Sequence, residues 1–159
     1  MHRKLRKFDP ALITKEFFPD HVTTPENINH GKCYAWAYAA YLMFEDMELW
    51  DLKSRWSHAF VFNTKTGKFY DSEKLNGVVD WKELPCTTAC GHTTGIAEKQ
   101  TVEIFQKEWN ESINWTDLSW KEIEKKVNRI LKRENDLFHK DTETPSTYQR
   151  VMRWMRREK

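Results

Sequence analysis

The run KCYAWAYAAYLMFE, residues 32–45, constrains the fold more than any other part of the sequence. It contains no Pro or Gly, and it is rich in alanine and large apolar side chains, a composition typical of a helix. Because apolar residues would occur on every side of that helix, other elements must cover it. We therefore predict a buried helix here, with Asn29 or Gly31 as its N-cap.

Two short β-prone runs follow this helix and predict a hairpin. The first is WSHAFVFN, residues 56–63, and the second is KFYDSE, residues 68–73, with TKTG between them. Residues 78–81, VVDW, are a possible third strand. The sheet is expected to end near the CTTACGHTTG segment that comes next.

Both ends of the chain differ from this central part. Residues 1–28 contain three prolines, so we expect an irregular arm with a short helix near residues 11–17. Ser119 and Glu122 form a capping-box pattern that predicts the start of a C-terminal helix. A second helix is expected after Pro145.

These elements predict the fold class α+β: an N-terminal buried helix packed on a small antiparallel sheet, with C-terminal helices. The length suits one domain over residues 1–159, with residues 29–82 as its core and residues 119–159 as the C-terminal helices. Eight Trp, nine Phe and five Tyr supply large side chains for that core, which excludes a disordered chain.

Composition also limits where the protein is expected to act. No run is long and apolar enough to cross a bilayer, and the basic N-terminus has no apolar segment behind it. We therefore expect neither a membrane contact nor a signal peptide. Three cysteines cannot form a full disulfide framework, which favours a reducing, cytoplasmic location. The sequence indicates no cofactor and no particular oligomeric state.

Cys33 would stand in the first turn of the buried helix, directly after a Gly-Lys pair. Unpaired N–H groups and the helix dipole stabilise negative charge at this position, which favours a thiolate nucleophile. Gly31 has no Cβ, so a substrate carbonyl could approach while the Cys33 amide points at the developing oxyanion. Candidates for a further oxyanion donor are Asn27, Asn29 and Tyr34.

A nucleophilic thiol needs a base, and the base needs an orienting group. If Asn63 pairs with Lys68, His58 and Asp71 become diagonal neighbours on one face of the hairpin, about 7 to 8 Å apart. A shift by two residues would place them directly opposite, whereas a one-residue slip would put Asp71 on the wrong face. His58 is therefore the candidate base and Asp71 the candidate orienting group, and we expect both to meet Cys33 in an open cleft.

The segments GKCYAWA, SHAFVF and GKFYDS resemble, in this order, the Cys, His and Asp motifs of the papain-like cysteine hydrolase superfamily. The transglutaminase-like and NlpC/P60-like branches are the most similar, and the resemblance covers residues 29–72. It implies a papain-like core in which a cysteine begins a buried helix beside a sheet that carries the other two residues. It also implies Cys33 as nucleophile, His58 as base and then acid, and Asp71 as the residue that orients the imidazole.

Such a thiolate would attack an amide or thioester carbonyl and form an acyl-enzyme. Water as the acceptor gives peptidase, amidase or deamidase activity, and an amine gives transamidation. The sequence does not choose among these reactions, and the expected substrate is a protein or a peptide-like amide. The alternative is a non-catalytic binding module of the same fold, in which Cys33 is a small buried hydrophobe and His58 a structural histidine.

Three residues of the CTTACGHTTG segment are weaker candidates, for a metal site. Cys86, Cys90 and His92 could supply three zinc ligands, but a structural site needs a fourth, so a loop with free thiols is favoured and no metal is expected.

The chain is basic at its C-terminus although its net charge is only +2. Residues 121–159 contain twelve Lys or Arg against seven Asp or Glu. In the binding-module alternative, the last helix would contact nucleic acid or a protein partner through Arg150, Arg153, Arg156 and Arg157. A solvated amphipathic helix, with at most a weak polyanion contact, is the favoured interpretation.

Overall fold

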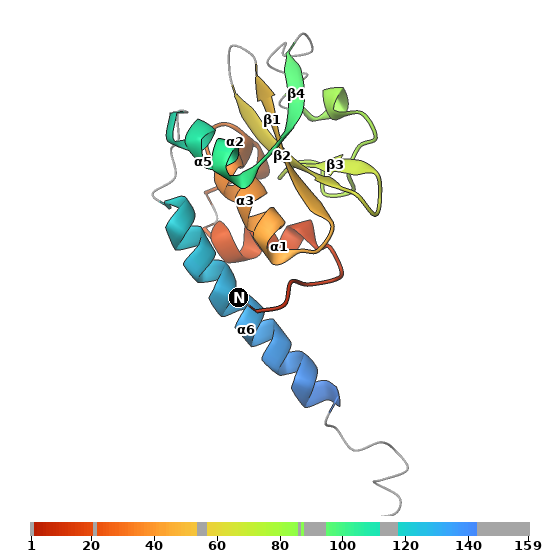
Figure 1. The fold of residues 1–159 in the computed structure, drawn as a ribbon, viewed down its shortest axis with the longest axis vertical. Helices are drawn as coiled ribbons and strands as arrows, with labels where there is room; N and C mark the ends of the chain where they lie inside the picture. Colours follow the sequence, from red (N-terminus) through yellow and green to blue (C-terminus); the bar gives the residue numbers. More distant parts are fainter. Residues whose placement is uncertain are drawn as a thin grey trace, which may run out of the picture.

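The computed structural model describes residues 2–20, 22–53, 57–85, 87, 95–111 and 118–142, with side chains through residue 138 in the last helix. The helices are α1 (Pro10–Phe17), α2 (Pro25–Asn29), α3 (Cys33–Met43), α5 (Val102–Glu111) and α6 (Trp120–Thr142). The strands are β1 (Met47–Lys53), β2 (His58–Asn63), β3 (Lys68–Tyr70) and β4 (Ile96–Gln100), and a 3-10 turn, η1, spans Trp81–Glu83. Figure 1 shows these elements in one view.

The four strands form one antiparallel sheet in the order β3-β2-β1-β4. Asn63 pairs with Lys68, which is the first of the two hairpin registers that the sequence allowed. The loop between them is held by Asn63, whose side-chain oxygen accepts hydrogen bonds from the backbone N–H groups of Lys65 and Thr66 at 2.9 and 3.1 Å. The predicted α+β class is confirmed, with a helix packed on a small antiparallel sheet.

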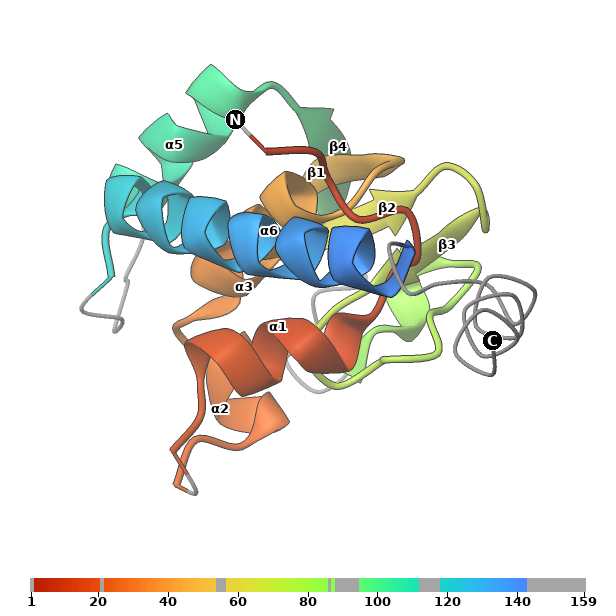
Figure 2. The same cartoon turned by 90° about the horizontal axis from the view of Figure 1, so that it is seen from below.

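The helix α3 is the buried helix that the sequence predicted. Every residue of it except Tyr41 is buried. It packs on β2 and β1 and is covered by α1 and α6 (Figures 1 and 2). Its bounds are shorter than predicted, and its N-cap is Lys32 rather than Asn29 or Gly31. This difference places Cys33 at the first helical position.

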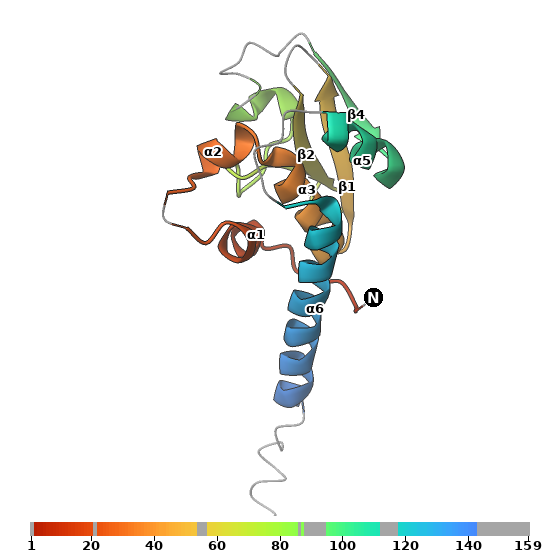
Figure 3. The same ribbon diagram turned by 90° about the vertical axis from the view of Figure 1, so that its left-hand side faces the viewer.

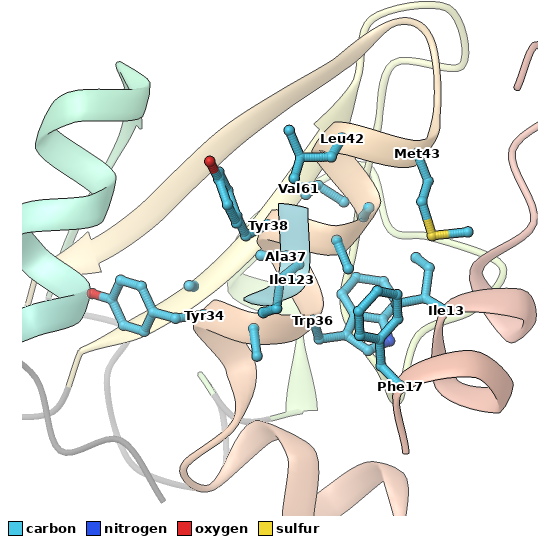
Figure 4. Packing of buried hydrophobic residues seen from close by; sticks show 14 of the residues in the cluster. Ile13, Phe17, Tyr34, Trp36, Ala37, Tyr38, Leu42, Met43, Val61 and Ile123 are labelled. Atoms are coloured by element: carbon cyan, nitrogen blue, oxygen red, sulfur yellow. The ribbon is translucent and has the colours of Figure 1, made fainter. Parts of the chain in front are cut away.

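The large side chains of α3 point in different directions, as Figure 4 shows. Trp36 lies beside Ile13 and Phe17 of α1, and its ring nitrogen donates to Thr14 Oγ1 at 3.2 Å. Tyr34 points the other way, toward α5. The helix is therefore clamped by aromatic contacts on opposite sides, which fixes its rotation about its own axis.

The helix α6 packs on α3 along an apolar stripe of four buried residues, Ile123, Val127, Ile130 and Leu131. The predicted capping box is confirmed: the Ser119 N–H donates to Glu122 Oε2 at 2.6 Å, and the Glu122 N–H donates to Ser119 Oγ at 3.3 Å. Beyond this stripe the helix projects past the rest of the described fold (Figure 3).

Several sequence-based expectations need correction. The helix predicted near residues 11–17 is confirmed as α1, but the arm also contains α2, so it is more regular than expected. The possible strand at residues 78–81 is wrong, because Val78 makes only an isolated bridge with Phe69 before η1 begins. The sheet continues beyond the predicted end with β4, and neither β1 nor α5 was part of the prediction.

Two loop glycines with positive φ offer a matched test of backbone strain and packing. At Gly67 (φ 68°) a Cβ would have no neighbour within 4 Å in the described part of the chain, whereas at Gly77 (φ 74°) it would lie 2.7 Å from the Tyr70 ring. We expect Gly67→Ala to lower the free energy of unfolding by about 1 kcal/mol, the cost of a left-handed residue with a side chain. Gly77→Ala should cost about 2 kcal/mol or more, because the Tyr70 ring must also move. Urea denaturation measures both losses, and equal losses would contradict the packing argument.

Candidate functional site

The turn between α2 and α3 sets the position of Cys33. Gly31 has φ 147°, a conformation that favours glycine, and the Lys32 N–H donates to Ile28 O at 2.8 Å to close the turn. The first helical hydrogen bond runs from the Trp36 N–H to Lys32 O at 3.1 Å. Backbone N–H groups of the first turn, including that of Cys33, therefore have no acceptor within the helix.

The sulfur of Cys33 lies against the first residues of β2. Cys33 Sγ accepts a hydrogen bond from the backbone N–H of Ala59 at 3.5 Å. That nitrogen belongs to the peptide that joins His58 to Ala59, so the sulfur lies beside the backbone of the candidate base. A backbone N–H donor of this kind binds a thiolate more strongly than a neutral thiol.

His58 and Asp71 meet where the hairpin register brings their strand ends together. His58 is the first residue of β2, Asp71 directly follows β3, and His58 Nε2 lies 3.3 Å from Asp71 Oδ2. The other carboxylate oxygen, Oδ1, accepts from the backbone N–H groups of Glu73 and Lys74 at 3.0 and 2.9 Å. The backbone thus fixes the carboxylate through Oδ1, while Oδ2 faces the imidazole.

Asn29 connects this carboxylate to the turn that precedes Cys33. Its side-chain nitrogen donates to Asp71 Oδ2 at 3.1 Å and to Glu73 Oε2 at 2.6 Å. Its side-chain oxygen lies 2.9 Å from Ser72 Oγ, whose hydroxyl is also 2.6 Å from Pro25 O and has one proton to donate. Asn29 therefore holds two carboxylates in place and is not available as an oxyanion donor.

The other proposed oxyanion donors have different partners. The Tyr34 hydroxyl donates to Asp51 Oδ2 at 2.9 Å. Asn27 is exposed, and its side-chain nitrogen donates to Val22 O at 3.5 Å. The backbone N–H of Cys33 is the remaining candidate that the sequence suggested.

All three candidate catalytic side chains are nearly inaccessible to solvent. Cys33 is 6% exposed, and His58 and Asp71 are each 1% exposed. The sequence led us to expect the three side chains in an open cleft. Instead they are enclosed, with the Cys33 sulfur against the Ala59 N–H and the His58 imidazole against Asp71. A substrate can reach the sulfur only if neighbouring groups move.

Asp51, in the middle of β1, is a buried carboxyl that sequence reasoning missed. It is fully buried, and within the described residues its Oδ1 has no hydrogen-bond partner. Burial raises the pKa of Asp51 to about 6, although the hydrogen bond from Tyr34 opposes this shift. The sequence contained one signal: in MELWDLK, Asp51 occupies the same alternate positions as the buried Met47 and Leu49.

The remaining candidates of the sequence fall on residues that the structure does not describe. Cys86, Cys90 and His92 lie outside the described residues, and so do the four arginines expected on the last helix, Arg150, Arg153, Arg156 and Arg157. Within the described ranges, no three His, Cys, Asp or Glu side chains form a group that could hold a metal ion.

Two further observations concern the rest of the described surface. A groove of about 450 Å³ lies near the other end of α3, between Tyr41, Leu49 and Gln100. It does not include Cys33, His58 or Asp71. None of the described helices has the length and apolar character that a membrane span requires.

No protein-family model, curated protein or solved structure matches the chain. The resemblance to papain-like enzymes therefore stays a prediction from residues 29–72. Function has to be argued from the geometry of the site.

Asn29 and Asn27 lie on the same short helix and form a matched pair for mutation. We expect Asn29→Ala to lower the free energy of unfolding by about 1 to 3 kcal/mol, because it leaves two carboxylates without their shared donor. Asn27→Ala should cost less than about 0.5 kcal/mol, since its side chain is exposed. Urea denaturation at pH 7 compares the two. A negligible loss for Asn29→Ala would show that its hydrogen bonds do not hold the site together.

Asp51 should make stability depend on pH in a specific direction. Because the pKa of Asp51 is raised from 3.8 to about 6, the folded state binds its proton more tightly, and the carboxyl destabilises the fold as pH rises between these values. The full cost above pH 6 is about 3 kcal/mol. We expect Asp51→Asn to gain about this much relative to the wild type between pH 4 and pH 7, as measured by urea denaturation at both values. A parallel pH dependence of variant and wild type would contradict the shift.

Proposed function

We propose that the chain is a cysteine enzyme that cleaves or transfers an amide or acyl group. Cys33 is the nucleophile, His58 is the base and then the acid, and Asp71 orients the imidazole. The proposal is carried by the 3.3 Å contact between His58 Nε2 and Asp71 Oδ2, together with the hydrogen bond that the Cys33 sulfur accepts from the Ala59 N–H, which belongs to the peptide that joins His58 to Ala59. These are the nucleophile, base and orienting group that thiol catalysis requires.

The geometry of the imidazole supports a defined direction of proton transfer. Because Nε2 faces Asp71, that nitrogen carries the proton in the neutral ring, and Nδ1 has the lone pair that can accept a proton from the thiol. Asp71 then stabilises the imidazolium that results. The Ala59 N–H supports the sulfur when it becomes negative.

The reaction follows from these roles. Cys33 Sγ–H passes its proton to His58 Nδ1, and the thiolate attacks the carbonyl carbon of the substrate. The carbonyl oxygen becomes an oxyanion near the Cys33 N–H, and collapse of this intermediate expels the leaving group with the proton from His58. The product is a thioester on Cys33, which water or an amine then attacks while His58 again accepts and returns a proton.

The acceptor decides which activity results. Water gives a peptidase, amidase or deamidase, and an amine gives a transglutaminase-type transfer. The proposed substrate is a protein or peptide-like amide, and the proposed location is the reducing cytoplasm, where a catalytic thiol stays free.

The burial of the site favours one alternative, a non-catalytic binding module of the same fold. With His58 and Asp71 each 1% exposed, their contact could serve only to satisfy two buried polar groups. In that case Cys33 would be an ordinary buried thiol. The two hypotheses differ in the protonation state of the sulfur near neutral pH.

The pH dependence of Cys33 alkylation tests the proposal. Iodoacetamide is small, and mass spectrometry can follow the modified Cys33 peptide in the wild type and in His58→Ala. We expect the wild-type sulfur to keep its reactivity down to about pH 6, because the imidazolium stabilises the thiolate. In His58→Ala the rate at pH 6.5 should fall about tenfold or more relative to that at pH 9.

The peptide NHGKCYAWAY, residues 29–38, is the matched control, since it has the same local sequence without the fold. The shapes of the profiles are compared rather than the absolute rates, because burial slows the reagent in the protein alone. A wild-type profile that follows the peptide and does not change in His58→Ala would refute the enzyme and favour the binding module.

A further inference from the structure

Asn29 belongs to a closed ring of contacts around the candidate site. Its side-chain nitrogen donates to Asp71 Oδ2 at 3.1 Å, and the same oxygen faces His58 Nε2 at 3.3 Å. The peptide that follows His58 carries the N–H that donates to Cys33 Sγ. Asn29 ends α2, four positions before Cys33, so the chain itself completes the ring.

The ring has a hairpin half and a helix half, and each is fixed without Asn29. His58 begins β2 and Asp71 directly follows β3, so both lie on the hairpin. The backbone N–H groups that hold Asp71 Oδ1 belong to the loop that follows it, on the same half. In the helix half, a backbone hydrogen bond of 2.8 Å closes the turn between α2 and α3. The Asn29 side chain connects the two halves through a hydrogen bond that does not use the reacting sulfur.

The orientation of the Asn29 amide is defined by its partners. Its nitrogen donates to Asp71 Oδ2 and to Glu73 Oε2, and its oxygen lies 2.9 Å from Ser72 Oγ. Ionised carboxylates accept hydrogen bonds and cannot donate, so the amide must present its nitrogen to them. Each proton of the NH2 group therefore faces a different carboxylate.

Offsetting charge is not the distinctive role of this amide. Asp71 keeps two backbone donors on Oδ1 without Asn29, and Glu73 is half-buried, so water reaches it. What the amide adds is a buried connection, with Asn29 itself only 4% exposed, between the carboxylate and the turn that presents the thiol. A fully satisfied buried polar contact of this kind rigidifies the groups that it joins.

We propose that Asn29 is a positioning residue that aligns the Cys33 thiol with the His58–Asp71 pair. The inference deepens the proposed function and rests on it. Asn29 touches neither the substrate nor the reacting atoms. It holds the turn before Cys33 against the carboxylate that orients the imidazole, so that the thiolate and the imidazolium stay close enough to stabilise each other.

Alignment and charge predict opposite effects of removing the amide. If Asn29 only offset the charge of Asp71, its loss would strengthen the hold of the carboxylate on the imidazolium, and the Cys33 thiolate would persist to lower pH. If Asn29 aligns the two halves, its loss weakens the ion pair, and the thiolate forms only at higher pH. The sign of the change therefore separates the two roles.

Asn29→Ala tests the alignment through the pH profile of Cys33 alkylation. The measured quantity is the rate at pH 6.5 divided by the rate at pH 9, which does not depend on how easily the reagent enters. We expect this ratio to fall about threefold or more below that of the wild type, the effect of a shift of about half a pH unit. An unchanged or higher ratio would overturn the proposal.

Two control variants show whether the effect belongs to the Asn29–Asp71 contact. Gly67→Ala lowers stability in the loop at the far end of the hairpin from His58, and its ratio should stay within about twofold of the wild type. Glu73→Gln removes the second carboxylate but keeps an oxygen that can accept from Asn29, and its ratio should also stay within about twofold. A fall in either control equal to that in Asn29→Ala would contradict the proposal.

A measurement on the wild type decides the question if Asn29→Ala does not fold. The NMR shifts of the two side-chain N–H protons of Asn29 can be followed through the titration of His58. Because both residues donate to Asp71 Oδ2, a charged imidazole should weaken the Asn29 bond to this oxygen. The proton that faces Asp71 should therefore shift more than the one that faces Glu73. Equal or absent shifts would overturn the proposal.

The two proposals fail in different ways. A Cys33 alkylation profile that does not depend on His58 refutes the enzyme, and Asn29 then has no ion pair to align. A profile that changes in His58→Ala but not in Asn29→Ala refutes the role of Asn29 alone. The expected result for both is a profile that each variant moves to higher pH, with the larger shift in His58→Ala.

Discussion

The burial of α3 on every side is the constraint on which the rest of the structure depends. A helix with apolar residues all round must be covered completely, and here the sheet covers one part of it while α1 and α6 cover the others. Because α3 packs on β2, the N-terminus of the helix lies against the first residues of that strand. This contact places the Cys33 sulfur on the peptide between His58 and Ala59. The position of the thiol is thus a consequence of how the core is packed.

The same end of α3 concentrates polar groups in an interior that is otherwise largely apolar. Among the buried polar side chains of the described residues, five lie in this cluster: Asn29, Asp51, His58, Asp71 and Ser72. Buried polar groups cost stability unless they are paired, and here most of them pair with one another. A cluster with a thiol, an imidazole and two carboxyls is typical of a functional site rather than of a core formed only by packing. Because the cluster is enclosed, catalysis would require a local movement that admits a substrate to the sulfur.

The hairpin illustrates how far local sequence information reaches. TKTG separates two β-prone runs by a length that allows few registers. The sequence therefore left two registers open, and the observed pairing of Asn63 with Lys68 is one of them; in both, Asp71 approaches His58. By contrast, β1 and β4 contain several charged residues, and their pairing across the sheet overrides their weak local preferences. Asp51 was missed for this reason, since its burial follows from β1 lying between β2 and β4.

The sequence by itself determined the buried helix, the start of α6 and the hairpin with its two allowed registers, because each depends on periodicity, capping or short-range pairing. It also suggested the three residues of the candidate site. Only the tertiary structure decided that Asn29 binds Asp71, that Tyr34 binds Asp51, and that the site is enclosed rather than open. The two hydrogen bonds join residues that are 42 and 17 positions apart in the chain. All three features arise from packing between elements. Local sequence patterns do not predict such contacts, because the side chains come from elements that only tertiary packing brings together.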